Sequence, residues 1–534
     1  MQVSYRSNVG ELPTCNRLGM TVKVLCSLLA ALLFLLAGTA YLESVPPAWW
    51  DEGWTLTVAR NWAESGHYGR LSLGENSPHG LQAALPVTMS VALAFKYFGV
   101  GLFQARFVIF LYSVAALALL FYLACRFYSR RVAIGALLVL LMMSGNRYMH
   151  PLFMARQVLG EVPALFFLLA GYVCLLWAEE RSRIFLLGSI LFWSLALVTK
   201  AQVLPFWALS LCAPLVIAIF MRQWTNAITF ALAFFCSALL GYFSQWVISE
   251  LLIPTPSSVS GLTQAVAFVL DPFRRFITVL TTLQIGLPTL LGLVWAFRNL
   301  RSNKFFESHT SAVRFAYFVL AGSWFAWWGL ASTGWARYLS PSAFLASIFV
   351  SAMLHDWTNG FRIREYVSNA ATSLARFNVR WRDLRTAGAL FLVGWASVQT
   401  VSDLGYALIG KTNKPLFDMV DYLNTRTASS AIIETYESEL FFLLDRRYHY
   451  PPDQVHVELI RREDLSESRV IDYDPLSADP DYLVVGGWCR YYKCYDSVLT
   501  SGAFGLVKTF GPYQVYKRVR GKVRPANASQ IAGS

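Results

Sequence analysis

Long apolar runs, repeated from Val22 to Ile409, constrain the fold of this chain more than any other feature. Each run holds roughly 18 to 24 residues, and a helix of that length can cross the roughly 30 Å hydrocarbon core of a bilayer. The composition agrees, because 56% of the 534 residues are hydrophobic and only 14% are charged, whereas a soluble protein is about a quarter charged. The sequence therefore predicts a polytopic α-helical membrane protein with about eleven membrane-spanning helices.

Basic residues between the apolar runs predict how the chain crosses the membrane. Arg6, Arg17 and Lys23 precede the first expected helix, and loops rich in Lys and Arg stay in the cytoplasm, so the N-terminus is expected there. We interpret the apolar segment 81–98 as lying in the interface, because a crossing there would place the basic segment 126–131 outside. Residues 43–105 are then one long external loop with membrane-lying helices.

The later apolar runs predict the remaining spanning helices. Their expected ranges are about 106–124, 132–145, 160–178, 184–199, 203–220, 226–248, 276–297, 313–331, 338–354 and 387–409. The segment 355–385 is rich in arginine, which favours the cytoplasm. The net charge of +13 thus reflects topology and phosphate-bearing ligands rather than nucleic acid.

The polar segment 411–534 predicts a small α/β domain that follows a transmembrane domain in residues 1–410. An odd number of spans places this domain outside the cytoplasm. The pattern predicts a helix at 416–425 and strands at 431–434, 482–485 and 513–516. Cys489 and Cys494 can form a disulfide if that compartment is oxidising, although their spacing alone does not establish one.

The stretch Trp49–Trp54 places two adjacent carboxylates, Asp51 and Glu52, among three tryptophans just after the first apolar run. Indole rings favour the membrane–water interface, where a lipid-borne headgroup would lie. Carboxylates at that depth cost free energy unless they are solvated or paired, which raises a functional hypothesis. The alternative is an ordinary hydrated loop whose tryptophans anchor the first helix.

On this topology, residues that would be costly in lipid converge on the external face. They are Asp51, Glu52, Arg156, Glu161, Lys200, Gln202, Arg337 and Tyr338. A carboxylate beside an acceptor hydroxyl can take its proton as the oxygen attacks, and cations can stabilise the charge that develops on a leaving phosphate. Each cation alone is explained as well by a helix-end side chain reaching toward water; together, and facing acids, they favour group transfer from a lipid phosphate.

The order of several short pieces resembles the GT-C membrane glycosyltransferases, in particular lipid A aminoarabinose transferases and protein O-mannosyltransferases. Besides Asp51–Glu52, the pieces are Tyr97–Val100, Gln104–Arg106, Ala155–Arg156, Gly160–Pro163, Val198–Gln202 and Trp335–Pro341. They span roughly residues 20 to 345. The relatives' Lys-Pro-Pro-like stretch is represented only by Ser77–Gly80, so the resemblance does not extend to the donor-sugar contacts.

The resemblance implies a role for each residue that matches. Asp51 corresponds to the catalytic acidic residue of the first external loop, and Glu161 takes the place of a second acidic residue. Lys200 and Arg337 fall where the family contacts the donor phosphate. The family is implied to use polyprenyl-phosphate sugars and to invert the anomeric centre. The expected protein is therefore an inverting glycosyltransferase of a bacterial cytoplasmic membrane, acting on a hydroxyl of a glycolipid, envelope glycan or protein.

Two alternatives stay open at this stage. A transporter or flippase of a lipid-linked sugar would show paired broken helices and internal pseudo-symmetry, which the sequence does not display. The second alternative is a catalytically inactive scaffold that binds prenyl lipid. His67, His79 and His150 could bind a divalent metal with Asp51, but no ligand spacing such as HExxH supports it, so no cofactor is expected.

Overall fold

The computed structural model describes residues 35–77, 84–252, 265–302, 308–362, 381–409 and 412–519. The chain divides into two units, Met1–Tyr41 and Leu42–Ser534. The first expected spanning helix lies mostly outside the described residues, of which 35–39 are helical.

The apolar runs between residues 102 and 409 form helices where the sequence predicts them. Their bounds are α4 Leu102–Phe127, α5 Arg130–Met142, α7 Glu161–Glu180, α8 Phe185–Thr199, α9 Val203–Phe220, α10 Trp224–Leu252, α12 Pro272–Thr281, α13 Leu287–Ser302, α14 His309–Leu330, α15 Ala336–Trp357 and α17 Trp381–Ile409. A π-helical turn, η2 (Thr282–Gly286), joins α12 to α13, and two short helices, η1 (Arg147–Met149) and α6 (Pro151–Met154), precede α7.

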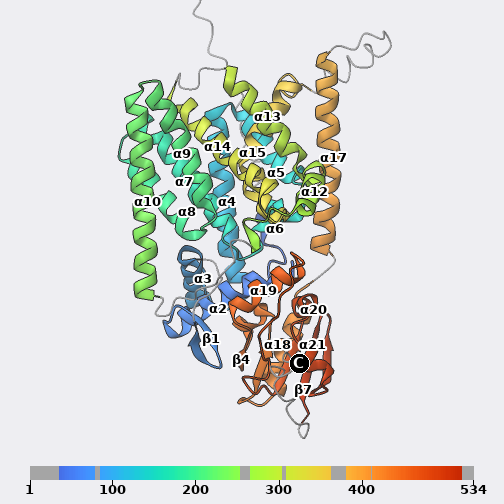
Figure 1. Ribbon diagram of the computed structural model, residues 1–534. Coiled ribbons are helices and arrows are strands. Elements are labelled where there is room, and N and C mark those ends of the chain that lie inside the picture. Colours follow the sequence, from blue (N-terminus) through green and yellow to red (C-terminus); the bar gives the residue numbers. More distant parts are fainter. Residues whose placement is uncertain are drawn as a thin grey trace, which may run out of the picture. The chain divides into compact units, whose positions relative to one another are not determined.

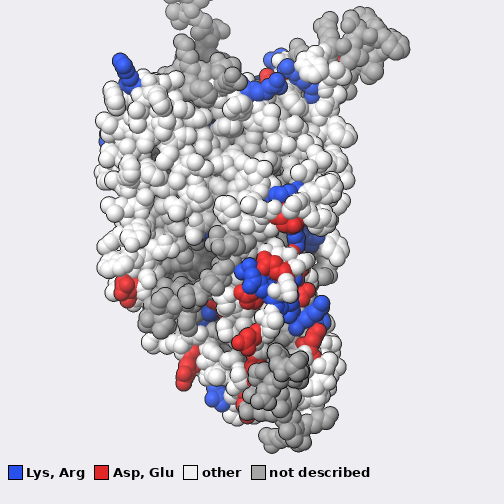
Figure 2. Space-filling model, viewed as in Figure 1, with Lys and Arg blue, Asp and Glu red and all other residues white. Residues whose placement is uncertain are grey.

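Six helices in the described part of the chain are long and apolar enough to cross a membrane. The helical part in Figure 2 presents a surface nearly free of charged side chains, and Lys and Arg gather at its upper edge. Charged side chains of both signs also gather toward the C-terminal sheet. This distribution is that of a multi-pass membrane protein, in which charged groups avoid the hydrocarbon layer.

The segment after residue 49 forms helix α2 (Trp50–Ser65), a hairpin of β1 (Arg70–Ser72) and β2 (Glu75–Ser77), and helix α3 (Leu85–Phe98). One face of α3 buries Val87, Val91 and Phe95 against α2 and α4. The other face exposes Leu93 and Tyr97. An apolar helix of 14 residues with such a face suits the interface better than a crossing.

The C-terminal segment folds into a five-stranded sheet covered by short helices. Its elements are α18 Lys414–Arg426, β3 Ile432–Thr435, η3 Ser438–Leu443, β4 Arg447–His449, α19 Asp453–Glu463, β5 Tyr482–Val485, α20 Gly487–Tyr492, α21 Asp496–Thr500, β6 Phe504–Phe510 and β7 Tyr513–Arg518. The strand order is β4-β3-β5-β7-β6. The first three strands are parallel and the last two pairings are antiparallel.

These elements confirm the predicted small α/β fold, including the helix near 416–425 and all three expected strands. Each of those strands has buried apolar positions, and this apolar pattern made the strands predictable from the sequence. Figure 1 shows α2 below the helical bundle and beside the C-terminal segment. Helix α2 therefore contacts the helical bundle on one side and the C-terminal segment on the other, so its side chains enter different surroundings.

Candidate active site

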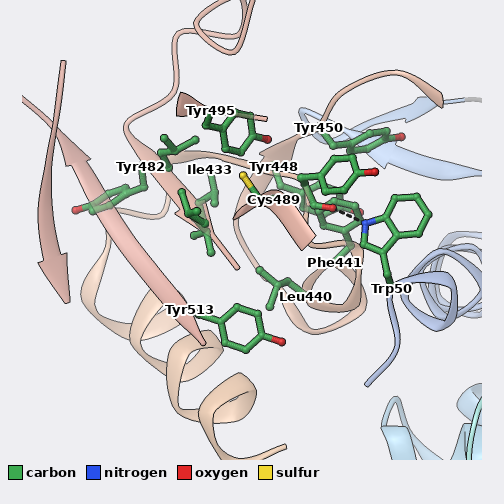
Figure 3. Packing of buried hydrophobic residues seen from close by; sticks show 14 of the residues in the cluster. Trp50, Ile433, Leu440, Phe441, Tyr448, Tyr450, Tyr482, Cys489, Tyr495 and Tyr513 are labelled. Carbon is green, nitrogen blue, oxygen red and sulfur yellow. Dashed lines mark hydrogen bonds between the residues drawn. The ribbon is translucent and has the colours of Figure 1, made fainter. Parts of the chain in front are cut away.

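The first turn of α2 sends consecutive side chains into different surroundings. Trp50 points into the core of the C-terminal segment, where its indole N–H donates to the Tyr436 carbonyl at 2.7 Å (Figure 3). Asp51 faces a cavity. Glu52 turns back toward the helical bundle. Successive side chains on a helix are about 100° apart, so three neighbours can serve three sites.

Asp51 forms an ion pair with a residue from far along the chain. Its Oδ2 lies 2.5 Å from Nη1 of Arg337, at the start of α15. Arg337 Nε also lies 3.5 Å from Oε1 of Glu161, the first residue of α7. The same Glu161 oxygen is 2.5 Å from Nζ of Lys200, which caps the C-terminal end of α8. Two carboxylates and two cations therefore alternate in one connected chain of ion pairs.

These four side chains line a cavity of about 1000 Å³. Gln202 and Tyr338 also line it, so six of the residues expected at the site from the sequence meet there. The cavity is bordered by the starts of α2, α7 and α15, the end of α8, part of α10, and the C-terminal segment. Its size is at the upper end of the roughly 300–1000 Å³ that is usual for pockets that bind drug-sized molecules.

The surroundings keep Asp51 ionised. Burial alone would raise the pKa of this carboxyl, but the charge of Arg337 and its hydrogen bond lower the pKa below the ordinary value. The Asp51 side chain is nonetheless 33% exposed, whereas Glu161 is only 4% exposed. Asp51 is thus the carboxylate that a molecule in the cavity can reach.

Glu52 does not line the cavity, although the sequence groups it with Asp51. Its two oxygens accept from Nε and Nη2 of Arg106, each at 2.9 Å, and both side chains are fully buried. The backbone N–H groups of Trp49 and Val158 donate to the same carboxylate at 2.9 and 3.0 Å. Every contact of Glu52 that the structure displays therefore holds the start of α2 against α4 and the segment before α7.

Arg156 also lies away from the cavity wall. It is 5% exposed, and its Nη1 donates to the carbonyl of Val45 at 3.1 Å. Burial and the nearby charge of Arg106 lower its pKa to about 10. Its position favours support of the segment before α2 over direct contact with a bound phosphate.

Of the expected histidines, His67 and His150 are described, and neither lines the cavity that Asp51 faces. His150 caps a short helix, accepting from the Leu152 N–H at 3.2 Å, and His67 is exposed. His79 lies outside the described residues. Among the residues that the structure describes, no group of three or more His, Cys, Asp or Glu side chains is arranged to hold a metal ion.

The C-terminal segment adds residues that the sequence did not single out. His456, Asp464, Trp488, Tyr491 and Tyr492 all line the cavity. The ring of His456 stacks on Trp50 with centroids 4.3 Å apart, and burial lowers the pKa of His456 to about 4, so this ring is neutral at pH 7. Nothing in the local sequence marks these positions, because they reach the cavity only through the packing of the sheet against α2.

The arrangement of these helices and the small sheet is an ArnT-like fold. No protein-family model matches the chain, and no curated protein matches it. The fold is similar to that of ArnT from Cupriavidus metallidurans in the apo state, with a TM-score of 0.60 and 13% identity over 95% of this chain and 100% of that one. The expected resemblance is thereby confirmed at the level of the fold.

Two further structures support the same fold. ArnT from Cupriavidus metallidurans bound to undecaprenyl phosphate gives a TM-score of 0.61 and 14% identity, covering 94% of this chain and 99% of that one. The apo oligosaccharyltransferase from Archaeoglobus fulgidus gives 0.50 and 12%, covering 93% of this chain and 75% of that one.

Proposed function

We propose that this protein is an inverting glycosyltransferase that moves a sugar from a polyprenyl-phosphate carrier to a hydroxyl acceptor at the outer face of the cytoplasmic membrane. The observation that carries the proposal is the alternating set Asp51–Arg337–Glu161–Lys200 on one cavity wall. The likeness to an ArnT structure bound to undecaprenyl phosphate supports a prenyl-phosphate carrier.

In the proposed reaction, Asp51 accepts the proton of the acceptor hydroxyl as that oxygen attacks the anomeric carbon of the donor. The bond from the anomeric carbon to the phosphate oxygen breaks, its electron pair leaves with the polyprenyl phosphate, and one displacement inverts the centre. A lowered pKa makes Asp51 a weaker base. Asp51 is nevertheless ionised throughout the neutral pH range, so it can always accept a proton.

Arg337 and Lys200 are the residues that we assign to the leaving phosphate. A guanidinium can contact two phosphate oxygens at once, and an ammonium supplies a compact charge. Glu161 lies between these two cations and holds both in position. Gln202 and Tyr338 border the same wall and can donate hydrogen bonds to the phosphate. The charges of Arg337 and Lys200 are in position before the donor binds, so little reorganisation is needed during the reaction.

The test uses purified protein in nanodiscs, radiolabelled polyprenyl-phosphate sugars and candidate acceptors. Asp51→Asn should lower transfer about 100-fold or more, the usual contribution of a general base, while undecaprenyl-phosphate binding stays intact. Arg337→Gln and Lys200→Gln should weaken that binding. Asp418→Asn, an exposed carboxylate outside the cavity, is the control and should behave like the parent protein.

Near-normal transfer by Asp51→Asn would remove its proposed role. Label that crosses the bilayer without any covalent product would favour the alternative of a lipid-linked sugar flippase. Bound donor with neither product nor movement would indicate an inactive scaffold.

A further inference from the structure

One wall of the cavity comes from the C-terminal segment and has no part in the chemistry proposed above. Tyr436 follows β3 directly, and Trp488 lies in α20, which follows β5. Both positions are at the carboxyl ends of neighbouring parallel strands. In sheets with parallel strands, ligands bind at this edge. The small sheet therefore turns its usual binding edge toward the cavity.

Aromatic rings cover this wall. The rings of Trp488 and Tyr492 are nearly parallel, at 19° with centroids 6.3 Å apart. Tyr491 packs edge-on against Tyr492 at 4.9 Å, and Trp49 packs edge-on against Trp488 at 5.1 Å. Trp488 is half-buried, whereas Tyr491 is 52% exposed. Tyr492 is only 4% exposed, so the aromatic surface that the protein leaves partly uncovered is that of Trp488 and Tyr491, both of which pack on Tyr492.

A carboxylate is fixed beside these rings. Asp464, just after α19, accepts from the hydroxyl of Tyr491 at 2.7 Å and from that of Tyr492 at 3.2 Å. An ionised carboxylate offers about four acceptor sites, so two further donors can be accommodated. Asp464 itself lines the cavity.

The wall lies close to the proposed general base. Asp51, His456 and Tyr492 line the same cavity. His456 stacks on Trp50, the residue before Asp51. A molecule held on the rings of α20 can therefore extend a hydroxyl group to Asp51.

We propose that this wall, defined by Asp464, Trp488, Tyr491 and Tyr492, binds a sugar ring of the acceptor. The inference rests on the proposed function. It specifies that the acceptor hydroxyl belongs to a saccharide. The apolar face of a sugar ring packs on aromatic rings, and its hydroxyls donate to a carboxylate, which leaves few polar groups unpaired.

Other occupants fit less well. A phosphate would be repelled by Asp464, and the phosphate-binding cations Lys200 and Arg337 belong to the transmembrane helices. An acyl chain would cover the rings but offer no further donor to Asp464, which would lose its contact with water and keep only the two tyrosine hydroxyls. The combination of aromatic faces and one carboxylate favours the saccharide.

The experiment measures saccharide binding separately from transfer. The protein is placed in nanodiscs without sugar-containing detergent, and mono- and disaccharides of glucose and glucosamine are titrated while tryptophan fluorescence is recorded. The parent protein should bind at least one of them. Tyr491→Ala and Asp464→Asn should each weaken that binding about tenfold, and Trp488→Ala should do so more strongly. Undecaprenyl-phosphate affinity should not change in any of the three.

Tyr491 is half exposed and Asp464→Asn preserves shape, so both variants should fold even if Trp488→Ala does not. Trp381→Ala and Asp479→Asn, at exposed sites away from the cavity, are the controls. Unchanged saccharide affinity in Tyr491→Ala and Asp464→Asn would overturn the inference, as would no binding of any saccharide in the panel. If Asp51-dependent transfer persists in that case, the proposed function stands and only the acceptor subsite is wrong. Loss of lipid affinity alone would indicate an acyl chain on the wall.

Discussion

Trp50, Asp51 and Glu52 are consecutive, yet each side chain has a different task. Trp50 enters the C-terminal core, Asp51 faces the cavity and Glu52 pairs with Arg106. The pair of acids that looks like one catalytic unit in the sequence therefore divides into one accessible carboxylate and one buried structural carboxylate. The difference comes from the rotation between neighbouring residues on a helix.

Glu52→Gln tests this division at the residue scale. Removing one charge of a fully buried pair leaves Arg106 uncompensated, so stability should fall by about 3–5 kcal/mol. Transfer per folded molecule should stay within a few-fold of the parent value. Thermal unfolding in detergent gives the first quantity, and initial rates normalised to folded protein give the second.

Glu64→Gln is the matched control, because Glu64 pairs with Arg60 on an exposed face of the same helix. This surface pair should contribute less than about 1 kcal/mol. A Glu52→Gln variant that is as stable as the parent protein but has lost transfer would indicate that Glu52 takes part in catalysis.

At the scale of elements, α2 and η3 pack so closely that one position requires glycine. A Cβ added at Gly53 would lie 2.2 Å from the carbonyl carbon and oxygen of Ser438 and 2.3 Å from the backbone nitrogen of Glu439. Backbone atoms cannot turn aside as a flexible side chain can. The same turn carries Asp51, so this contact also fixes the cavity wall.

Gly53→Ala should therefore destabilise the protein by about 1–3 kcal/mol or more, the usual cost of forcing extra atoms into a packed site. Transfer should fall as well, because α2 must move. The control is Gly388→Ala in α17, where a Cβ meets nothing within 4 Å. That variant should gain about 0.5–1 kcal/mol from helix propensity. Equal melting temperatures for the two variants would show that the close contact is not required.

The segment at η3 also carries two buried acids, Glu437 and Glu439, which are 0% and 3% exposed. Burial raises the pKa of Glu437 to about 7 and the pKa of Glu439 well above its ordinary value, where the nearby Glu437 raises it further. Glu437 accepts from the Cys489 N–H and Glu439 from the Tyr513 hydroxyl, each at 2.9 Å. Protonated acids are thus part of the packing between α2 and the sheet.

These raised pKa values predict a loss of stability toward alkaline pH. Between the ordinary carboxyl pKa and the raised one, the folded state holds more protons than the unfolded state, so the unfolding free energy falls as pH rises. His456 has the opposite effect on the unfolding free energy below pH 6.5, because its pKa is lowered from 6.5 in the unfolded chain to about 4 in the folded protein. The effect of the acids therefore dominates above pH 6.5, with a slope on the order of 1 kcal/mol per pH unit.

Melting temperatures recorded from pH 6.5 to 8.5 provide the measurement. Glu439→Gln should flatten the decline, because the pKa of Glu439 is raised well above its ordinary value whereas that of Glu437 is raised only to about 7. The exposed Glu75→Gln should leave the decline unchanged. A decline of the same size in all three proteins would mean that other groups cause it.

At the scale of the whole molecule, the side of the membrane on which the C-terminal sheet lies would decide which leaflet supplies the donor of the proposed reaction. Asp51, Glu161 and Lys200 lie at helix ends that face this sheet across the cavity. Arg181 lies at the other end of α7, about 30 Å from Glu161 for a helix of 20 residues. The proposed orientation places the sheet outside and Arg181 in the cytoplasm.

Single cysteines test this orientation in intact cells. Val470→Cys is at a position that is 93% exposed in the C-terminal segment, and it should react with a membrane-impermeant maleimide added from outside. Arg181→Cys should react only after permeabilisation. The parent protein gives the background from its native cysteines. Protection of Val470→Cys in intact cells, with labelling of Arg181→Cys, would reverse the proposed topology.

The sequence by itself determined the class of fold, most helix positions and three of the five C-terminal strands, because apolar run length and local alternation depend on neighbouring residues. It also placed Asp51, Glu161, Lys200 and Arg337 at one face, since basic loops set the topology.

Only the tertiary structure decided which of these residues meet. Asp51 and Arg337 are 286 positions apart, and their contact depends on how α15 packs beside α2. The same packing turned Glu52 and Arg156 away from the cavity and brought in Asp464 and Trp488 from the sheet. The direction of a side chain around a helix, and the partner that covers it, follow from long-range packing that no local pattern encodes.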